Sequence, residues 1–306
     1  MDDPSHDHQR RHRRLPRRPL RRRSDAVASV VGTILAVLVL TTLLSIAMGV
    51  WVPAMMKSRE AAHNQDAFRD LLALKAAIDD QVARATPGDE RSTPVTMGFA
   101  DVPIFVAETK GTVAVDPVGG AVSIAEKNLS VSRAGSSRVV FRSQNSFYLQ
   151  QAIIYEAGGL LVYQDQGQLV RAAPPVSLLN DSGVKTLTVT LLYLLAENQS
   201  QGGSLTVDIR TTLIDTSTES YNWSGGLGGR NIYLNITTQY KDAWLAYYNQ
   251  SLARAGLDPG ITDPGDDIQG DYDYEELAGG TGVSIQFSNI HFLSVTRAIV
   301  KLDMKA

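Results

Sequence analysis

The hydrophobic pattern of the chain begins with one long apolar segment near the N-terminus. Residues 26–52, AVASVVGTILAVLVLTTLLSIAMGVWV, carry no charge and consist mainly of Val, Leu, Ile, Ala and Thr. A helix of this length spans about 40 Å, more than the ~30 Å hydrocarbon core of a bilayer. It is also longer than the ~7–15-residue apolar region of a cleaved secretory signal. The pattern predicts a transmembrane helix rather than the core helix of a soluble protein.

A second helical pattern follows the apolar segment. Pro53 is expected to kink the helix, because proline removes one backbone hydrogen bond. Beyond it, apolar residues such as Leu71 and Ile78 recur at three- and four-residue steps, opposite acidic residues. Pro87 and its neighbours then end the helix. Residues 53–85 are therefore predicted to form an amphipathic helical stalk.

From residue 94 onward, short apolar runs alternate with Gly, Pro and Asp turns. The segment AIIYEAGGLLVYQDQGQLVRA, residues 152–172, predicts three strands joined by two glycine-containing turns. About a dozen such runs favour an antiparallel sandwich over a parallel α/β sheet. The predicted fold is α+β: a long N-terminal transmembrane helix, then a mostly antiparallel β-sandwich exodomain over residues 94–306.

One helix is predicted within the strand region, at about 238–255. Thr237 or Thr238 is expected to cap it, and Gly256 to end it. Aromatic residues are dense around this helix: Tyr221, Trp223, Tyr233, Tyr240, Trp244, Tyr247 and Tyr248. Such a cluster occurs in sugar-binding platforms, but at this helical and strand spacing it is more typical of a core.

Charge is divided unequally along the chain. Residues 1–25 hold nine Arg and four acidic residues, a net charge of +5, so the other 281 residues carry −8 of the total of −3. The positive-inside rule predicts a cytoplasmic, Arg-rich leader and an extracellular C-terminal domain in a single-pass membrane protein. Arginine tails also bind nucleic acid phosphates. Beside a membrane span, topology and contact with anionic lipid are favoured, so no nucleic acid partner is predicted.

Catalytic and cofactor chemistry finds little support in the sequence. The absence of cysteine excludes disulfides, thiolate metal sites and a cysteine nucleophile. The two histidines beyond the leader, His63 and His291, are expected on the surface, and neither lies in a metal-binding or nucleophile motif. We predict a non-enzymatic protein with no catalytic residues and no cofactor; an exported hydrolase is the weakest of the functions considered.

One acidic segment has enough carboxylates for a calcium site. Residues 258–276 contain eight acidic residues and no base. Ca²⁺ takes six to eight oxygen ligands, which this density supplies, but the ordered spacing of a calcium loop is missing. A solvated acidic loop is the favoured interpretation. The calcium candidates are Asp263, Asp266, Asp267, Asp271 and Asp273.

Sequons for N-glycosylation are more frequent than expected. Six match the pattern N-x-Ser/Thr, against roughly 1.5 expected by chance for this acceptor pattern. All follow the apolar segment, which agrees with an extracellular domain. Their asparagines are Asn128, Asn180, Asn198, Asn222, Asn235 and Asn249.

Residues 24–40, SDAVASVVGTILAVLVL, follow a run of arginines. This arrangement resembles the N-terminus of archaeal type IV pilin-like proteins, which carry a class III signal peptide. The resemblance implies cleavage by a prepilin-type peptidase around Ser24, Asp25 and Ala26. Segments 153–174, 186–195 and 238–256 also resemble an uncharacterised group of archaeal pilin-like membrane proteins. That likeness implies a surface protein with a large β-rich outer domain on an N-terminal helix.

Small residues in the apolar segment suit close packing of helices. Ala28, Ser29, Gly32 and Ala36 let neighbouring backbones approach, so other pilin-like subunits are expected partners alongside the membrane. The leading hypothesis is a pilin-like cell-surface protein, either a minor filament subunit or a membrane-anchored surface domain. The alternative is a membrane-tethered extracellular binding protein, for a glycan or an envelope layer, that does not polymerise.

Overall fold

The structure, a computed structural model, describes residues 22–99, 109–126, 129–224, 229–260 and 270–305. The chain divides into two compact units, Met1–Met55 and Met56–Ala306. The second unit is called the head below.

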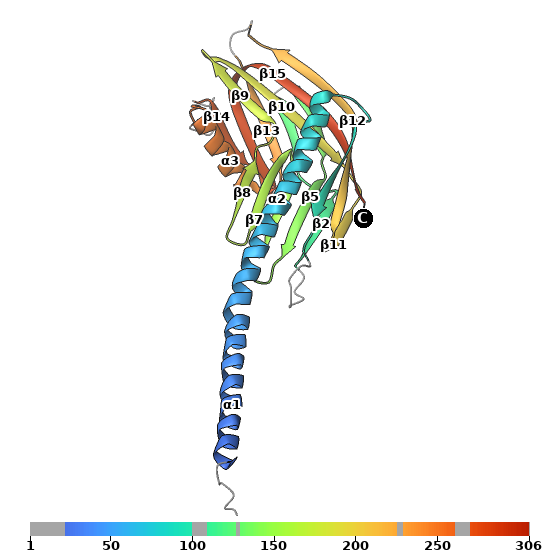
Figure 1. The fold of residues 1–306 in the computed structure, drawn as a ribbon. Coiled ribbons are helices and arrows are strands. Elements are labelled where there is room, and N and C mark those ends of the chain that lie inside the picture. Colours follow the sequence, from blue (N-terminus) through green and yellow to red (C-terminus); the bar gives the residue numbers. More distant parts are fainter. Residues whose placement is uncertain (1–21, 100–108, 127–128, 225–228, 261–269, 306) are drawn as a thin grey trace, which may run out of the picture. The chain divides into compact units, whose positions relative to one another are not determined.

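The described residues of the first unit, from Arg22 onward, are helical. Helix α1 covers Arg22–Ile46, a π-helical segment, η1, covers Ala47–Trp51, and α2 (Val52–Arg84) begins next (Figure 1). The N–H of Val52 donates to the carbonyl oxygen of Ala47, five residues earlier, which is the π-helical pattern. Pro53 has no N–H to offer an α-helical acceptor. The wider turn before it is the local irregularity found where a proline-induced kink was predicted.

Apolar side chains surround α1 and η1. Among the described residues, one helix is long and apolar enough to cross a membrane, and its most apolar 18-residue window contains no buried residue. The large apolar side chains from Val27 to Trp51 are each between 48 and 66% exposed. A helix that is apolar on every side has no polar face to turn toward water.

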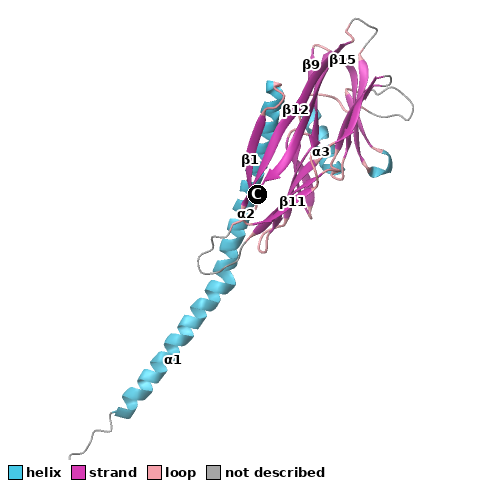
Figure 2. Cartoon of the chain, turned by 90° about the vertical axis from the view of Figure 1, so that its right-hand side faces the viewer, coloured by secondary structure: helices cyan, strands magenta, loops and turns pink. Residues whose placement is uncertain are grey.

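The head is β-rich and contains two sheets in its described residues, in agreement with the predicted α+β class (Figure 2). The first sheet has nine strands: β1 (Glu90–Thr96), β3 (Ala121–Glu126), β4 (Leu129–Gly135), β9 (Val176–Asp181), β10 (Val184–Leu195), β12 (Thr206–Asn222), β13 (Arg230–Thr237), β14 (Tyr272–Glu276) and β15 (Gly282–Lys305). The second has six: β2 (Lys110–Asp116), β5 (Arg138–Gln144), β6 (Gln151–Glu156), β7 (Gly159–Gln164), β8 (Gly167–Ala172) and β11 (Gln199–Gly203).

Strand β15 organises the larger sheet. It pairs antiparallel with β12, β13 and β14, and parallel with β10, so the sheets are mostly but not wholly antiparallel. The sequence pattern predicts two strands here, 283–287 and 292–302, but the structure has one strand. Asn289, at φ +58°, introduces an irregularity without ending the pairing.

Two hydrophobic clusters fill the head. Alternate residues of β5 and β6 enter different clusters, because successive side chains of a strand point to opposite faces. Val140 and Ile154 pack with α3 (Lys241–Arg254), whereas Phe141 and Tyr155 pack with α2. The middle of the six-stranded sheet is therefore buried on both faces.

Helix α2 belongs to the head from Met56 onward, although the sequence pattern assigns residues 53–85 to a separate stalk. The helix ends at Arg84, as expected, and within the head it lies against the strands (Figure 1). Leu71, Leu74 and Ile78 are fully buried there. An amphipathic helix buries its apolar stripe wherever a matching surface exists, and the β-rich region supplies it.

Helix α3 lies where a helix was predicted, with one correction at its start. Its N-cap position is Tyr240, which makes no capping bond through its side chain, so the expected cap at Thr237 or Thr238 is wrong. The Thr238 hydroxyl instead accepts the Tyr240 N–H and donates to Glu156. The end is as expected: Gly256 has φ +73°, the left-handed conformation of a helix C-terminus.

Candidate functional site

The residues predicted for helix packing all lie exposed on α1. Ala28, Ser29, Gly32 and Ala36 are exposed, and a Cβ added to Gly32 would meet no described atom within 4 Å beyond its own helical turn. This surface is therefore available to lipid or to another chain. The predicted processing residues Ser24, Asp25 and Ala26 lie at the start of α1, and their side chains are outside the described part of the structure.

The predicted glycosylation sites differ in accessibility. Asn180, Asn198, Asn222 and Asn249 are exposed, as an acceptor for a bulky glycan requires. Asn235 is half-buried in β13, between β3 and β15. Asn128 lies outside the described residues.

The calcium hypothesis gains no support from the acidic segment. Asp263, Asp266 and Asp267 lie outside the described residues. Asp271 forms an ion pair with Lys185 (Oδ1 to Nζ, 2.5 Å) and accepts the N–H of Asp258 (3.0 Å). The lysine lowers the pKa of Asp271 despite its partial burial. Asp273 is half-buried, and the described residues contain no group of three acidic or histidine side chains placed to hold a metal.

His63 is buried, so the expectation of a surface histidine is wrong. Its ring lies edge-on to Phe99 and Phe141, with centroids 5.8 Å away in both cases. Its Nε2 lies 3.1 Å from the carbonyl oxygen of Met97, to which a neutral ring would donate. Burial lowers the pKa of His63 below its ordinary value, against smaller opposing effects from this bond and from nearby acids. His291 accepts the N–H of Lys185 through Nδ1 and is half-buried.

Glu60 clamps a loop onto the first turns of α2 within the head. Its carboxylate is 1% exposed and accepts three consecutive backbone N–H groups, those of Ser146 (2.9 Å), Phe147 (2.8 Å) and Tyr148 (2.6 Å). Hydrogen bonds from several amides to one carboxylate are the stronger, charge-assisted kind. Glu60 therefore fixes the loop between β5 and β6 at one end of α2.

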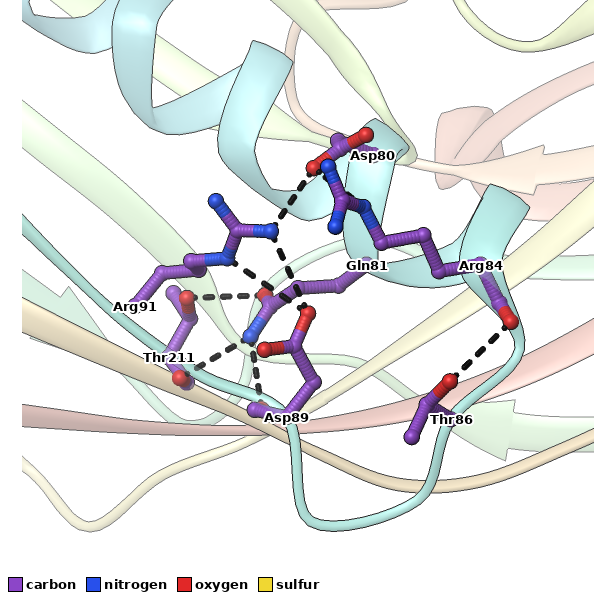
Figure 3. A network of polar contacts seen from close by, with 7 residues as sticks. All are labelled: Asp80, Gln81, Arg84, Thr86, Asp89, Arg91 and Thr211. Atoms are coloured by element: carbon purple, nitrogen blue, oxygen red, sulfur yellow. Dashed lines mark hydrogen bonds and ion pairs between the residues drawn. The ribbon is translucent and has the colours of Figure 1, made fainter.

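A polar network secures the opposite end of α2. Gln81 is fully buried; its amide donates to the carbonyl oxygens of Asp89 (2.8 Å) and Thr211 (3.1 Å) and accepts the Thr211 hydroxyl (2.8 Å) (Figure 3). Beside it, Arg91 bridges Asp80 and Asp89. These bonds join α2 to β1 and β12.

A second buried carboxyl joins α3 to the six-stranded sheet. Glu156 Oε1 accepts the Thr238 hydroxyl (2.5 Å) and the indole N–H of Trp244 (2.9 Å), while Oε2 is buried without a partner among the described residues. Burial raises the pKa of Glu156, against the lowering effect of these bonds. Tyr240, Trp244 and Tyr248 are buried around it, which favours the core over the sugar-platform interpretation of these aromatics.

A cleft of about 470 Å³ lies between α2 and strands β6, β7 and β8. Its polar lining is Asn64, Gln65, Arg69, Gln151, Gln164 and Arg171, with Phe68 and Tyr148 as aromatic neighbours. Gln164 donates to Gln151 across the β6–β7 pair (3.0 Å). The guanidinium of Arg171 lies over the Phe68 ring, 4.8 Å from its centroid. No sequence motif predicts a site at these residues.

A groove of about 540 Å³ also borders α2, beside Thr96, Gly98 and Phe99. Its charged groups are largely engaged within the protein: Arg69 pairs with Asp66 (2.9 Å), and Asp70 accepts the N–H of Thr96 (2.9 Å). The cleft at Arg171 is therefore the stronger candidate for a ligand.

Comparison with known proteins adds a family but no activity. A search of curated proteins finds no match. Residues 25–273 match a family described as of unknown function, DUF7289, and that stretch covers most of α1 and most of the head. The chain therefore belongs to the family of unknown function DUF7289.

Proposed function

We propose that this protein is a non-enzymatic, pilin-like cell-surface protein, anchored in the membrane by α1 with its head outside the cell. The observation that carries the proposal is the exposure of every large apolar side chain from Val27 to Trp51, beside a head that has its own buried core. So much apolar surface is stable only when lipid or other apolar helices cover it.

Charge and sequons support the orientation. The leader carries +5 directly before the apolar helix, which favours a cytoplasmic N-terminus. Four of the six sequon asparagines are exposed on the head, where a glycan is accommodated without repacking.

Protease treatment of intact cells tests the topology. Digestion should remove the head after Lys57 and leave the leader, residues 1–25, protected. Degradation of the leader with a protected head would overturn the orientation.

We also propose two finer features. The two sheets form a β-sandwich, since residues of both enter each hydrophobic cluster. The leader is removed near Ser24, Asp25 and Ala26 by a prepilin-type peptidase, as the resemblance to pilin-like N-termini implies. N-terminal sequencing of the mature protein should therefore begin near Ala26; an intact leader would contradict processing.

Membership of a filament is the most specific part of the proposal. A helix that is apolar on every side is as stable among identical helices as it is in lipid. The variant Gly32→Leu tests packing there, because a Cβ at this position has open space beyond its own helical turn, whereas a leucine side chain prevents close approach by another helix. Thr41→Leu, nine residues later and so on the opposite face of α1, is the matched control.

The measurement is the amount of protein in sheared surface filaments relative to the membrane fraction. We expect Gly32→Leu to leave the filament fraction and remain in the membrane, while Thr41→Leu behaves as wild type. Wild-type protein confined to the membrane fraction would contradict filament membership and leave the second candidate, a tethered binding protein. The polar cleft beside α2 favours that candidate.

A further inference from the structure

The cleft beside α2 has walls that are fixed in place by bonds outside it. Tyr148 is held through its backbone N–H by the carboxylate of Glu60 (2.6 Å), and Gln151 and Gln164 are neighbours in the β6–β7 pair. Phe68 lies on a helix whose buried face packs into the head core. A site built on such elements needs little reordering when a ligand binds.

Arg171 gives the cleft a positive charge that no acidic side chain in the described part of the chain neutralises. Among the described residues, no carboxylate lies within ion-pair distance of Arg171, and the cleft lining contains no acid; the other arginine of the lining, Arg69, pairs with Asp66 outside it. Stacking on Phe68 occupies only the face of the guanidinium, so its in-plane N–H groups remain available for a planar anion. A carboxylate is the group that this fork binds through two parallel hydrogen bonds.

The positive charge is local. The chain beyond residue 25 carries a net charge of −8, so a general attraction of anions to the head is not expected. A ligand for the cleft must therefore place its negative charge close to Arg171 while the rest of it makes other contacts.

Side-chain amides supply those contacts. Asn64, Gln65, Gln151 and Gln164 each carry both donors and acceptors, which suits hydroxyl groups that also donate and accept. Asn64 is 3% exposed; among the described residues its Nδ2 makes one long bond, of 3.5 Å, to the carbonyl oxygen of Leu149, and its Oδ1 accepts a second long bond, of 3.4 Å, from Asn145 Nδ2. Tyr148 adds an aromatic ring beside these amides.

We propose that the cleft binds an acidic saccharide, with a sugar carboxylate on Arg171 and sugar hydroxyls on the amides. The volume of about 470 Å³ falls within the usual range for small-ligand sites. The proposal rests on the proposed function in one respect, that the head lies outside the cell, where such saccharides occur. Within that function it names the ligand class of a tethered surface protein.

Calorimetric titration of the full chain in detergent tests the proposal. The probes are a short oligogalacturonate and its fully methyl-esterified form, which has the same length and hydroxyls but no charge. We expect saturable binding of the acid and about tenfold weaker binding of the ester.

Three variants separate the contribution of the Arg171 charge to binding from that of the side-chain amides. Arg171→Gln should weaken binding of the acid about tenfold and leave the ester unchanged, because only the charged contact is lost. Gln65→Leu should weaken both probes. Arg254→Gln, an exposed arginine on α3 outside the cleft, should bind as wild type. Equal thermal midpoints of the variants show that they are folded.

Several results would overturn the proposal: no binding of the oligogalacturonate, equal loss in Arg171→Gln and Arg254→Gln, or equally tight binding of sulfate or glycerol phosphate. The last outcome would assign the cleft to a simple anion or a lipid headgroup. Because the titration is done in detergent, it is independent of topology, which the protease experiment reports separately.

Discussion

Helix α1 and the part of α2 that belongs to the head differ in how the hydrophobicity of their residues relates to burial. α1 is apolar and makes no buried contact over its most apolar window, whereas α2 carries many charged residues and buries nine of its side chains, four of them polar. Burial in this protein therefore does not follow from hydrophobicity alone. It follows from whether a partner is present: strands and backbone amides for α2, and no burying partner among the described residues for the apolar window of α1.

The largest expected effect comes from placing the same change in the two regions. Leu38 in α1 and Leu205 in the head are both exposed, at 61% and 77%. Leu38→Arg should cost about 2.5–3.5 kcal/mol for insertion at the centre of a bilayer, which lowers the equilibrium constant for insertion by about two orders of magnitude. Leu205→Arg should have no such effect. Membrane fractionation measures both, and equal behaviour would remove the contrast between the regions.

The second prediction concerns the loss of a hydrogen-bond acceptor on α2, the carboxylate of Glu60. Glu60→Gln replaces one carboxylate oxygen by an NH₂ group that faces backbone N–H donors, and it removes the charge that strengthens these bonds. We expect the free energy of unfolding to fall by about 2–3 kcal/mol. Denaturant unfolding in detergent measures it, with the exposed Glu197→Gln as control. Equal stability of the two variants would show that the Glu60 clamp contributes little.

The third prediction concerns the buried carboxyl that anchors α3. Because the pKa of Glu156 is raised in the folded state above its ordinary value near 4.5, its contribution to stability is full below that value and is lost as the pH rises through the raised pKa. Glu156→Gln keeps an acceptor for Thr238 and Trp244 but cannot ionise. The variant should gain stability relative to wild type between pH 4.5 and pH 8, measured by thermal midpoint. A constant difference across that range would refute the ionisation argument.

The smallest effect on stability is expected at His63, and its dependence on pH is opposite to that of Glu156. Its folded pKa is lowered below the ordinary value of 6.5, so its contribution is full above that pH and is lost as the pH falls through the lowered pKa. His63→Gln retains a donor for the Met97 carbonyl but does not titrate. Wild type should lose stability relative to this variant between pH 7 and pH 5. Parallel pH profiles would mean that the buried ring does not titrate there.

Local patterns predicted the elements that depend on short-range sequence. The apolar segment follows from an unbroken run of uncharged residues, the end of α2 near residue 85 from Pro87 and its neighbours, and the end of α3 from Gly256. The packing of α2 needed partners far along the chain, such as Thr211, and could not be predicted from periodicity. A signal for it was present, however: Glu60 and His63 lie three or four residues from other buried positions on the stripe that continues to Leu71.

The candidate cleft was not predictable from the sequence. Its polar side chains come from residues 64 and 65 on α2 and from 151, 164 and 171 on three strands, and no local motif links them. Only the pairing of β6 with β7 and the burial of α2 bring them together. In the same way, Glu156 belongs to an apolar strand pattern, and its partners on and before α3 are more than eighty residues away.

The position of β15 in the chain has a consequence for how the head folds. β15 lies between strands that precede it by large sequence separations; Thr188 of β10, for example, is in register with Ser294. Contacts of this kind give a high contact order. Such proteins fold slowly because the entropy of closing a long loop is lost before the strand pairing can compensate for it. Until β15 is in place, β10, β12 and β13 each lack a neighbour and present unpaired strand edges. During synthesis, therefore, most of the head cannot complete its strand pairing until β15 has been made. In that interval it is most exposed to aggregation and to proteases.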